Sequence, residues 1–366
     1  MLSPAYAVFN FLGIFFILLP AGWHWSARNT ATLLFIFWCL VSVVPAAINS
    51  VVWYDRVDIK APIYCDIVTK LRIGGDVGVP AALLCITRQL EAIAAARQAY
   101  FSAKDRQQRR LVDLAIGLGI PILIMVLHTV VQGHRYDIIE RVGCIPSVYW
   151  SLPAVFLVII WPVVLLLAAA VYGALALRLF IARRYQFARL LESSQSAIST
   201  SRFIRLIALA ALQIAYTVPI ALCLRIIQFV TIPLNHYDSW ENVHFGFNYV
   251  GIITLHQFEL GPKAYARLQE LNYWSYAMSC AIFFMFFGLG EESIASYRRW
   301  LSKIMPCLGR YSISDEACGR SSRIATQISL PPYPHLEHPL DKGNKEGGTP
   351  SNGIYVTVQE ENFTSV

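Results

Sequence analysis

Four ionisable residues inside a long apolar segment have the types and spacing that could do chemistry. Asp66, Lys70, Arg72 and Asp76 lie in the stretch from Tyr64 to Leu90, YCDIVTKLRIGGDVGVPAALLCITRQL, whose second half is apolar enough to cross a bilayer. Charged side chains at membrane depth are costly unless they face a bundle interior or a wet cavity and find partners there. The pairs Asp66/Lys70 and Arg72/Asp76 are each four residues apart, the spacing at which helical side chains meet. The stretch therefore predicts a central membrane helix that lines a pocket.

The residues alone leave the role of these charges open. Lys70 and Arg72 could contact polar groups of a ligand, or they could only balance Asp66 and Asp76 and hold a helix bundle together. The Arg72/Asp76 pair lies deeper, which favours the balancing role for that pair. Together with Arg225, the same groups could also form a proton or ion relay, so a transporter or channel is the rival class.

The composition indicates the medium in which the chain folds. Of its 366 residues, 56% are hydrophobic and 14% are charged, whereas an ordinary soluble domain is roughly 45–50% apolar and about 25% charged. The apolar residues fall in blocks, and the mean hydropathy is +0.50, so the predicted fold class is an all-α membrane protein. The net charge of +7 does not point to nucleic acid, because the basic residues lie between the blocks, where a membrane topology places them.

Seven apolar blocks are long enough to span a bilayer, which takes roughly 17 to 25 residues. They predict a seven-transmembrane helix bundle with spans at Tyr6–Trp25, Ala31–Trp53, Tyr64–Leu90, Leu111–Val131, Trp150–Leu177, Leu206–Val230 and Asn272–Leu289. The stretch His244–Phe258 is short and is interrupted by Gly246 and Gly251. We interpret it as an interfacial or lid-like loop, although an eighth span is the alternative.

Lys and Arg residues concentrate in alternate loops, and the positive-inside rule then places the N-terminus outside and the tail in the cytosol. Cys65 lies at the outer end of the third span in this topology, and Cys144 lies in the outer loop before the fifth. A disulfide is permitted on that side of the membrane, so we predict a Cys65–Cys144 disulfide. The alternative is two separate thiols.

The composition divides the chain into three parts. Residues 1–290 form the predicted bundle domain. Residues 291–310 could form a short juxtamembrane helix, because apolar residues recur there at close to helical spacing. Residues 311–366 are rich in Pro, Gly, Ser and charge, which predicts a disordered cytosolic tail.

The second and third cytosolic loops carry the basic residues that could dock a protein partner. The candidate contacts are Arg97, Arg106, Arg183, Arg184 and Arg202. Basic residues beside a span also bind anionic membrane lipid without any protein partner, so charge alone does not separate the two roles.

Pro219 lies within the predicted sixth span, where it removes a backbone donor and can bend the helix. A bent sixth helix could be a hinge that opens the cytosolic face. The alternative is a static kink.

The sequence contains no motif typical of an enzyme or of a metal site. The spans carry no HExxH motif or paired catalytic His and Asp, and the chain has no CxxC spacing that suggests zinc. Lys70 is the only lysine inside a predicted span, so a retinal Schiff base in the last span is not expected. We expect no enzymatic activity, no cofactor and no metal.

Several runs of residues resemble the fungal mating-pheromone receptors of the a-factor-receptor type, the class D G-protein-coupled receptors. The runs are CDIVTKLRIGGDVGVPAALLCITRQL in the third span, WHWSARNTATLLFIFWCL and AAINSVVWYD across the second, GCIPS around Cys144, and ARRYQFARLLESSQSAISTSRFIRLIALA in the third cytosolic loop. The resemblance covers about residues 6 to 300. The DRY and NPxxY motifs of animal receptors are absent, so a mechanism built on them does not transfer.

The resemblance implies a multi-pass receptor of the plasma membrane that recognises a mating partner. Its ligand would be a small peptide pheromone with a prenylated, carboxymethylated C-terminal cysteine, its cytosolic partner a heterotrimeric G protein, and a homodimer is compatible with this class. On the ligand side, the candidate contacts are Asp66, Lys70, Arg72, Trp53 and Tyr54, with the aromatic loop Tyr237–Tyr249. On the cytosolic side, the five arginines named above become the candidate G-protein contacts.

Overall fold

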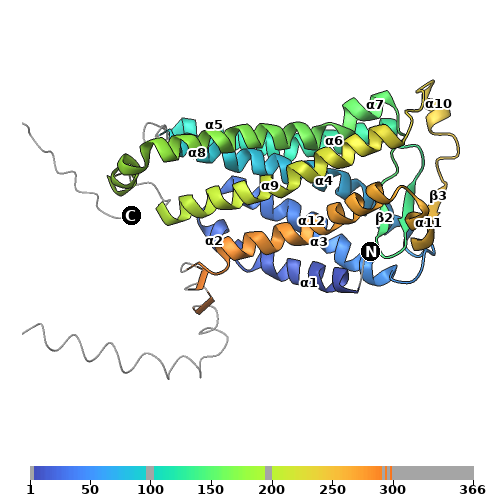
Figure 1. The fold of residues 1–366 in the computed structure, drawn as a ribbon, viewed down its shortest axis with the longest axis horizontal. Coiled ribbons are helices and arrows are strands. Elements are labelled where there is room, and N and C mark those ends of the chain that lie inside the picture. The colour runs from blue at the N-terminus through green and yellow to red at the C-terminus, as the bar shows by residue number, and fades with distance from the viewer. Residues whose placement is uncertain (1–3, 96–102, 194–199, 291–292, 295–296, 299–366) are drawn as a thin grey trace, which may run out of the picture. The chain divides into compact units, whose positions relative to one another are not determined.

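Long helices run side by side through the computed structural model of the chain, which describes residues 4–95, 103–193, 200–290, 293–294 and 297–298 (Figure 1). The first three spans are α1 (Ala5–Leu18) with α2 (Ala21–Ser26), then α3 (Thr30–Val52) and α4 (Pro62–Ala94). Pro20 separates α1 from α2, because it cannot donate the backbone hydrogen bond that a continuous helix needs.

The fourth and fifth spans are each built from consecutive helical segments. The fourth comprises α5 (Ala103–Leu114), the π-helical η2 (Ala115–Gly119), α6 (Ile120–Leu127) and the 3-10 helix η3 (His128–Val131). The fifth comprises α7 (Leu152–Ala154), the π-helical η4 (Val155–Ile159) and α8 (Trp161–Ser193).

The last two spans are α9 (Thr200–Thr231) and α12 (Lys263–Phe287). Within the described residues, six spans are both long and apolar enough to cross a membrane on their own composition. The seventh, α12, carries polar residues in its first half, but it packs against α1 and α9 and completes the bundle. The fold is therefore a seven-helix membrane bundle, as predicted, although the expected start of the last span at Asn272 is nine residues too late.

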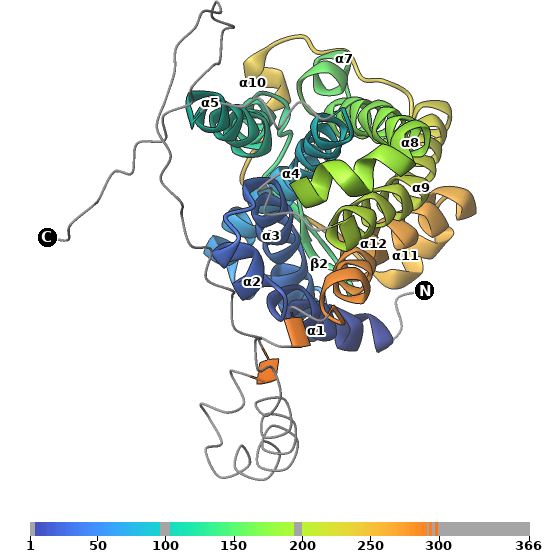
Figure 2. The same cartoon turned by 90° about the vertical axis from the view of Figure 1, so that its left-hand side faces the viewer.

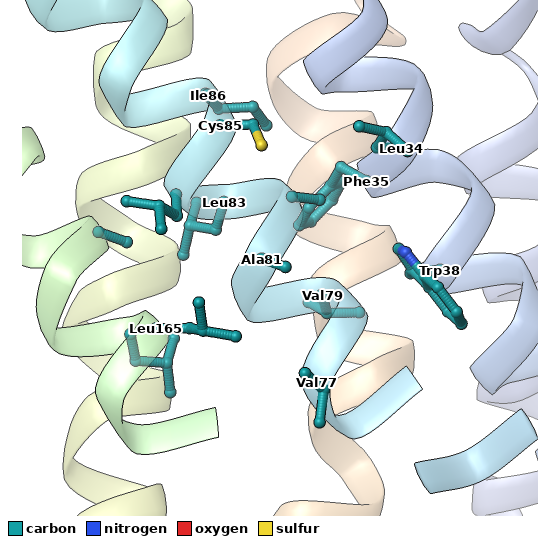
Figure 3. Packing of buried hydrophobic residues seen from close by; sticks show 14 of the residues in the cluster. Leu34, Phe35, Trp38, Val77, Val79, Ala81, Leu83, Cys85, Ile86 and Leu165 are labelled. Carbon is teal, nitrogen blue, oxygen red and sulfur yellow. The ribbon is translucent and has the colours of Figure 1, made fainter. Parts of the chain in front are cut away.

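The third span is the axis of this bundle. In the most apolar 18-residue window of α4, 89% of the residues are buried, against 61% for α3 and 22–28% for the other candidate spans. Seen end-on, α4 lies between α3 and α8 (Figure 2), and Leu83, Val79 and Ala81 pack toward Leu165 of α8 and Phe35 of α3 (Figure 3).

Small residues let α3 approach this axis closely. Gly74, Gly75 and Gly78 of α4 face the side chains of Trp38 and Ser42, and a Cβ on any of them would collide with those neighbours. The Trp38 indole then reaches past α4 and donates to the carbonyl oxygen of Gly117 in η2 at 2.6 Å. Single π-helical turns inside α-helices are rare, and they often occur at functional sites.

A small sheet covers one end of the bundle, and the all-α expectation omitted it. β1 (Tyr136–Ile139) pairs antiparallel with β2 (Gly143–Ile145) and parallel with β3 (Val250–Ile253), in the order β2-β1-β3. The short helices α10 (Trp240–Val243) and α11 (Leu255–Leu260) flank β3. The stretch His244–Phe258 is thus a structured loop and not an eighth span, as predicted. We call the sheet the lid, and the end of the bundle that it covers the lidded end.

The close contact between α3 and α4 yields a stability prediction. We expect Gly78→Ala to lower the free energy of unfolding by about 1–3 kcal/mol, because the new methyl group overpacks against the Trp38 ring. The melting temperature of the detergent-purified protein measures the effect. Gly119→Ala is the matched control, since no atom of the described residues lies within 4 Å of a Cβ there. Equal melting temperatures for the two variants would contradict the packing assigned to Gly78.

Candidate functional site

The four charges in the first half of α4 make their direct contacts with neighbouring elements and not with one another. Asp66 accepts two hydrogen bonds from Arg135, from Nε to Oδ1 at 2.8 Å and from Nη2 to Oδ2 at 2.6 Å. This two-pronged contact is the geometry in which an arginine and a carboxylate interact most strongly, and it raises the pKa of Arg135. The predicted Asp66/Lys70 pair is therefore wrong, because Arg135, in the loop before β1, takes its place.

Lys70 instead contacts the fourth span. Its Nζ donates to Nδ1 of His128 at 2.9 Å, and His128 is fully buried. An ammonium group can only donate, so Nε2 of His128 carries the ring proton and donates to the carbonyl oxygen of Ser147 at 3.0 Å. The half-buried Lys70 is thus connected through His128 to the loop that follows β2.

Arg72 and Asp76 face the opposite side of α4 from Lys70. The guanidinium of Arg72 lies 4.8 Å from the ring centre of Tyr273, which is within the range of a cation–π interaction. Asp76 accepts a hydrogen bond from the Tyr276 hydroxyl, and both tyrosines belong to α12. The predicted Arg72/Asp76 pair does not form a direct ion pair among the described residues, because the contacts of both side chains go to α12.

A cleft opens beside Asp76, with about 750 Å³ of empty space including its mouth. Four spans line it: α4, α8, α9 and α12. The lining residues are Gly75, Asp76, Val79, Pro80, Leu83, Pro162, Val163, Leu166, Gln213, Thr217, Ile220, Ala221, Leu224, Arg225, Asn272, Ser275, Tyr276 and Ser279. Apolar walls with a few converging polar groups are typical of a binding site for a small organic ligand.

Most polar residues of the cleft come from spans where no ligand contact was predicted. Asp76 belongs to α4, whereas Arg225 and Gln213 are contributed by α9, and Tyr276 and Ser279 by α12. The sequence identified Arg225 as a charged residue in an apolar block, but as a member of the rival ion relay and not as a ligand contact. Of the predicted ligand contacts, none lines the cleft; Lys70 and Asp66 lie between it and the sheet, and Arg72 lies against Tyr273.

The lid is fixed to the bundle by a disulfide and by backbone hydrogen bonds. Cys65 of α4 is bonded to Cys144 of β2, as predicted, and both are buried. The amide of Arg141 donates to the carbonyl oxygen of Trp53 at 2.7 Å. Through β3, the segment after α9 joins the same sheet, and the amide of Asn235 donates to the carbonyl oxygen of Trp150 at 2.8 Å.

Two predicted ligand contacts lie within this fixed region. The Trp53 side chain is 1% exposed, packs with the disulfide, and donates from its indole nitrogen to the carbonyl oxygen of Asp58 at 3.0 Å. Tyr54 is half-buried beneath the guanidinium of Arg141, 5.3 Å from its ring centre. A ligand contact with Trp53 would therefore require this cluster to open, whereas Tyr54 is accessible.

At the end of the bundle opposite the sheet, a partly buried ion pair joins the third and fourth spans. Nη2 of Arg88 lies 2.7 Å from Oδ1 of Asp113.

Arg106 is exposed on α5. Arg97 and the side chains of Arg183, Arg184 and Arg202 lie outside the described residues, so those candidate contacts remain predictions. Pro219 lies within α9, between the cleft residues Gln213 and Arg225.

A bundle of seven membrane helices, with an apolar cleft among four of them and a disulfide-fixed lid at one end, defines a multi-pass membrane protein. Comparison with known proteins gives the family. Residues 5–307 match the Pheromone A receptor family, and the chain belongs to that family. The resemblance noted in the sequence is thereby confirmed.

Individual relatives agree with this assignment. The Pheromone B beta 1 receptor of Schizophyllum commune is 36% identical over 339 residues, which cover 93% of this chain and 62% of that protein. Pheromone receptor 1 of Ustilago hordei is 35% identical over 303 residues, 83% of each chain. The Pheromone a factor receptor of Saccharomyces cerevisiae is 26% identical over 300 residues, 80% of this chain and 60% of that protein. The chain spans 45–62% of the length of four Schizophyllum commune receptors that it matches.

The disulfide between α4 and the lid yields a second stability prediction. Replacing Cys144 by Ser should lower the free energy of unfolding by about 4–5 kcal/mol from chain entropy alone, because the bond closes a loop of 79 residues. A thermal melt of the purified protein measures this, and dithiothreitol should shift the wild-type protein in the same direction.

Cys223→Ser is the matched control, since Cys223 is an exposed free thiol on α9. A Cys144→Ser protein that melts together with this control would contradict a structural role of the disulfide.

Proposed function

We propose that the protein is a plasma-membrane receptor for a prenylated peptide mating pheromone, and that it activates a heterotrimeric G protein in fungal mate recognition. The observation that carries the proposal is the match of residues 5–307 to the Pheromone A receptor family. Relatives that are named as pheromone receptors in Schizophyllum commune, Ustilago hordei and Saccharomyces cerevisiae support it. The lidded end is then extracellular, as the distribution of basic residues predicts.

The cleft suits such a ligand. A prenylated peptide presents mostly apolar surface and few polar groups, and the cleft walls combine Leu83, Leu166 and Ile220 with a small polar set. The sheet and the segment after α9 cover this end, so the prenyl chain reaches the cleft between helices from the surrounding lipid. The peptide part then extends toward Lys70 and Tyr54 at the lid.

The opposite end serves the G protein in this proposal. Arg106 of α5 and the three arginines that border the loop between α8 and α9 supply positive charge there, and Arg97 lies in the loop between α4 and α5. Pro219 is the hinge about which α9 opens that face. We further propose that residues 291–310 form a juxtamembrane helix, that residues 311–366 form a disordered tail, and that the receptor forms homodimers.

The rival transporter function loses its main support from the geometry of α4. Asp66 and Lys70 reach the loop before β1 and the fourth span, whereas Arg72 and Asp76 reach α12 on the other side of the helix. A relay needs titratable groups that follow one path, and these four groups are divided between two opposite sides of α4.

The coupling is tested by guanine-nucleotide exchange on a G protein reconstituted with the purified receptor. We expect a prenylated mating peptide to accelerate exchange, and Arg183→Gln combined with Arg184→Gln to abolish the acceleration while peptide binding persists. Arg178→Gln is the matched control, an exposed arginine of the same helix that tests lipid electrostatics. Exchange that persists in the double variant would place the G-protein contact elsewhere, and ion flux without exchange would favour the transporter.

The role of Lys70 is tested with Lys70→Gln in a mating-reporter assay with measured surface expression. Loss of a hydrogen bond to a charged group costs about 1.5–3 kcal/mol, so the half-maximal pheromone concentration should rise roughly 10- to 100-fold. The matched control is Lys263→Gln, at the exposed start of α12. Normal sensitivity at normal expression would restrict Lys70 to holding His128 in place.

A further inference from the structure

Two arginines in the interior of the bundle lie near one carboxylate, Asp76. Arg72 precedes Asp76 by about one turn of α4, and Arg225 lines the same cleft as Asp76, which is the only carboxylate among the described residues of that cleft. Within the described part of the chain, the direct partners of the two guanidinium groups are neutral. Arg225 donates from Nη1 to Oε1 of Gln228 at 2.7 Å, and Arg72 faces the ring of Tyr273.

Two other carboxylates of the third and fourth spans, one toward each end of the bundle, are engaged by other arginines. Asp66 is engaged by Arg135 and Asp113 by Arg88. An arginine stays protonated inside a protein, and tyrosine hydroxyls are neutral at physiological pH. The group formed by Arg72, Arg225 and Asp76 therefore has a formal charge of +1, and an uncompensated charge at membrane depth is unfavourable.

This excess charge adjoins the cleft. Arg225 and Asp76 both line it, whereas Arg72 is held against α12. Gln213 supplies a second, independent feature on the same wall. It is fully buried, its Nε2 donates to Tyr216 and Ser279, and its Oε1 has no hydrogen-bond partner within the described part of the chain.

We infer that the cleft binds an anionic group, and specifically a side-chain carboxylate of the peptide ligand, on Arg225. The inference rests on the proposed function. A bound carboxylate brings the group of Arg72, Arg225 and Asp76 to neutrality, and an arginine binds it with two parallel hydrogen bonds. Oε1 of Gln213 accepts a hydrogen bond from a ligand N–H group, which a peptide supplies and a simple inorganic anion does not.

The experiment is a double-mutant cycle between receptor and peptide. The probe is the prenylated peptide that activates the receptor in the reporter assay, synthesised with each Asp or Glu replaced in turn by Asn or Gln. We expect one such replacement to weaken activation of the wild-type receptor roughly 10- to 100-fold, as for a charged hydrogen bond. Against Arg225→Gln the same replacement should have little effect, because the partner charge is already lost.

Two further receptor variants separate local contact from folding and from general electrostatics. Arg225→Lys keeps the charge and should retain part of the preference for the acidic peptide, and surface expression of each variant is measured. Arg267→Gln removes an exposed positive charge from α12 and should leave the preference intact.

The possible results distinguish this inference from the proposed function. An activating peptide without any carboxylate, or equal losses for the acidic and amide peptides at Arg225→Gln, would overturn the inference alone. Activation that depends on chloride and not on the peptide carboxylate would overturn it in favour of an inorganic anion. A receptor that responds to no prenylated peptide would overturn the proposed function together with the inference.

Discussion

The structure depends on one constraint: charged groups within the third span must find partners inside the bundle. The charges in the first half of α4 satisfy it with three neighbouring elements, and these contacts position the elements. Asp66 binds the loop before β1, Lys70 binds the fourth span through His128, and Asp76 binds α12 through Tyr276. The other half of α4 is apolar and is positioned differently, by buried small residues such as Ala81 and Ala82 that let α3 and α8 pack closely.

The lid follows from the same helix. The disulfide of Cys144 links β2 covalently to the start of α4, and β1 pairs with both β2 and β3. The segment after α9 thus reaches the third span through a backbone ladder and one covalent bond. An edge of the sheet that would otherwise expose unpaired backbone groups is used to hold this segment. A ligand that enters from the covered end must displace part of this ladder, and for that reason lateral entry from lipid suits a prenylated peptide.

The sequence predicted what depends on local pattern and missed what depends on distant partners. Block lengths gave the seven spans, and topology gave the Cys65–Cys144 disulfide. The Asp66/Lys70 pair failed because spacing on a helix is worth about 0.2–0.5 kcal/mol, and the two-pronged contact from Arg135 outcompetes it. Helical geometry alone, at about 100° per residue, already separates Lys70 from Arg72. The sheet was missed because its strands have three or four residues and β3 pairs with a strand more than 100 residues earlier.

The position of the cleft also bears on how the two ends of the protein communicate. Gln213 and Arg225 lie in one helix on either side of Pro219, and both line the cleft. A ligand that contacts both residues spans the one point of α9 where the backbone ladder is interrupted. In the proposed mechanism, the binding energy depends on the bend of α9, and by reciprocity the bend depends on the ligand. Because α9 continues to the opposite end of the bundle, the proposed change of bend at Pro219 would alter the face that carries the predicted G-protein contacts.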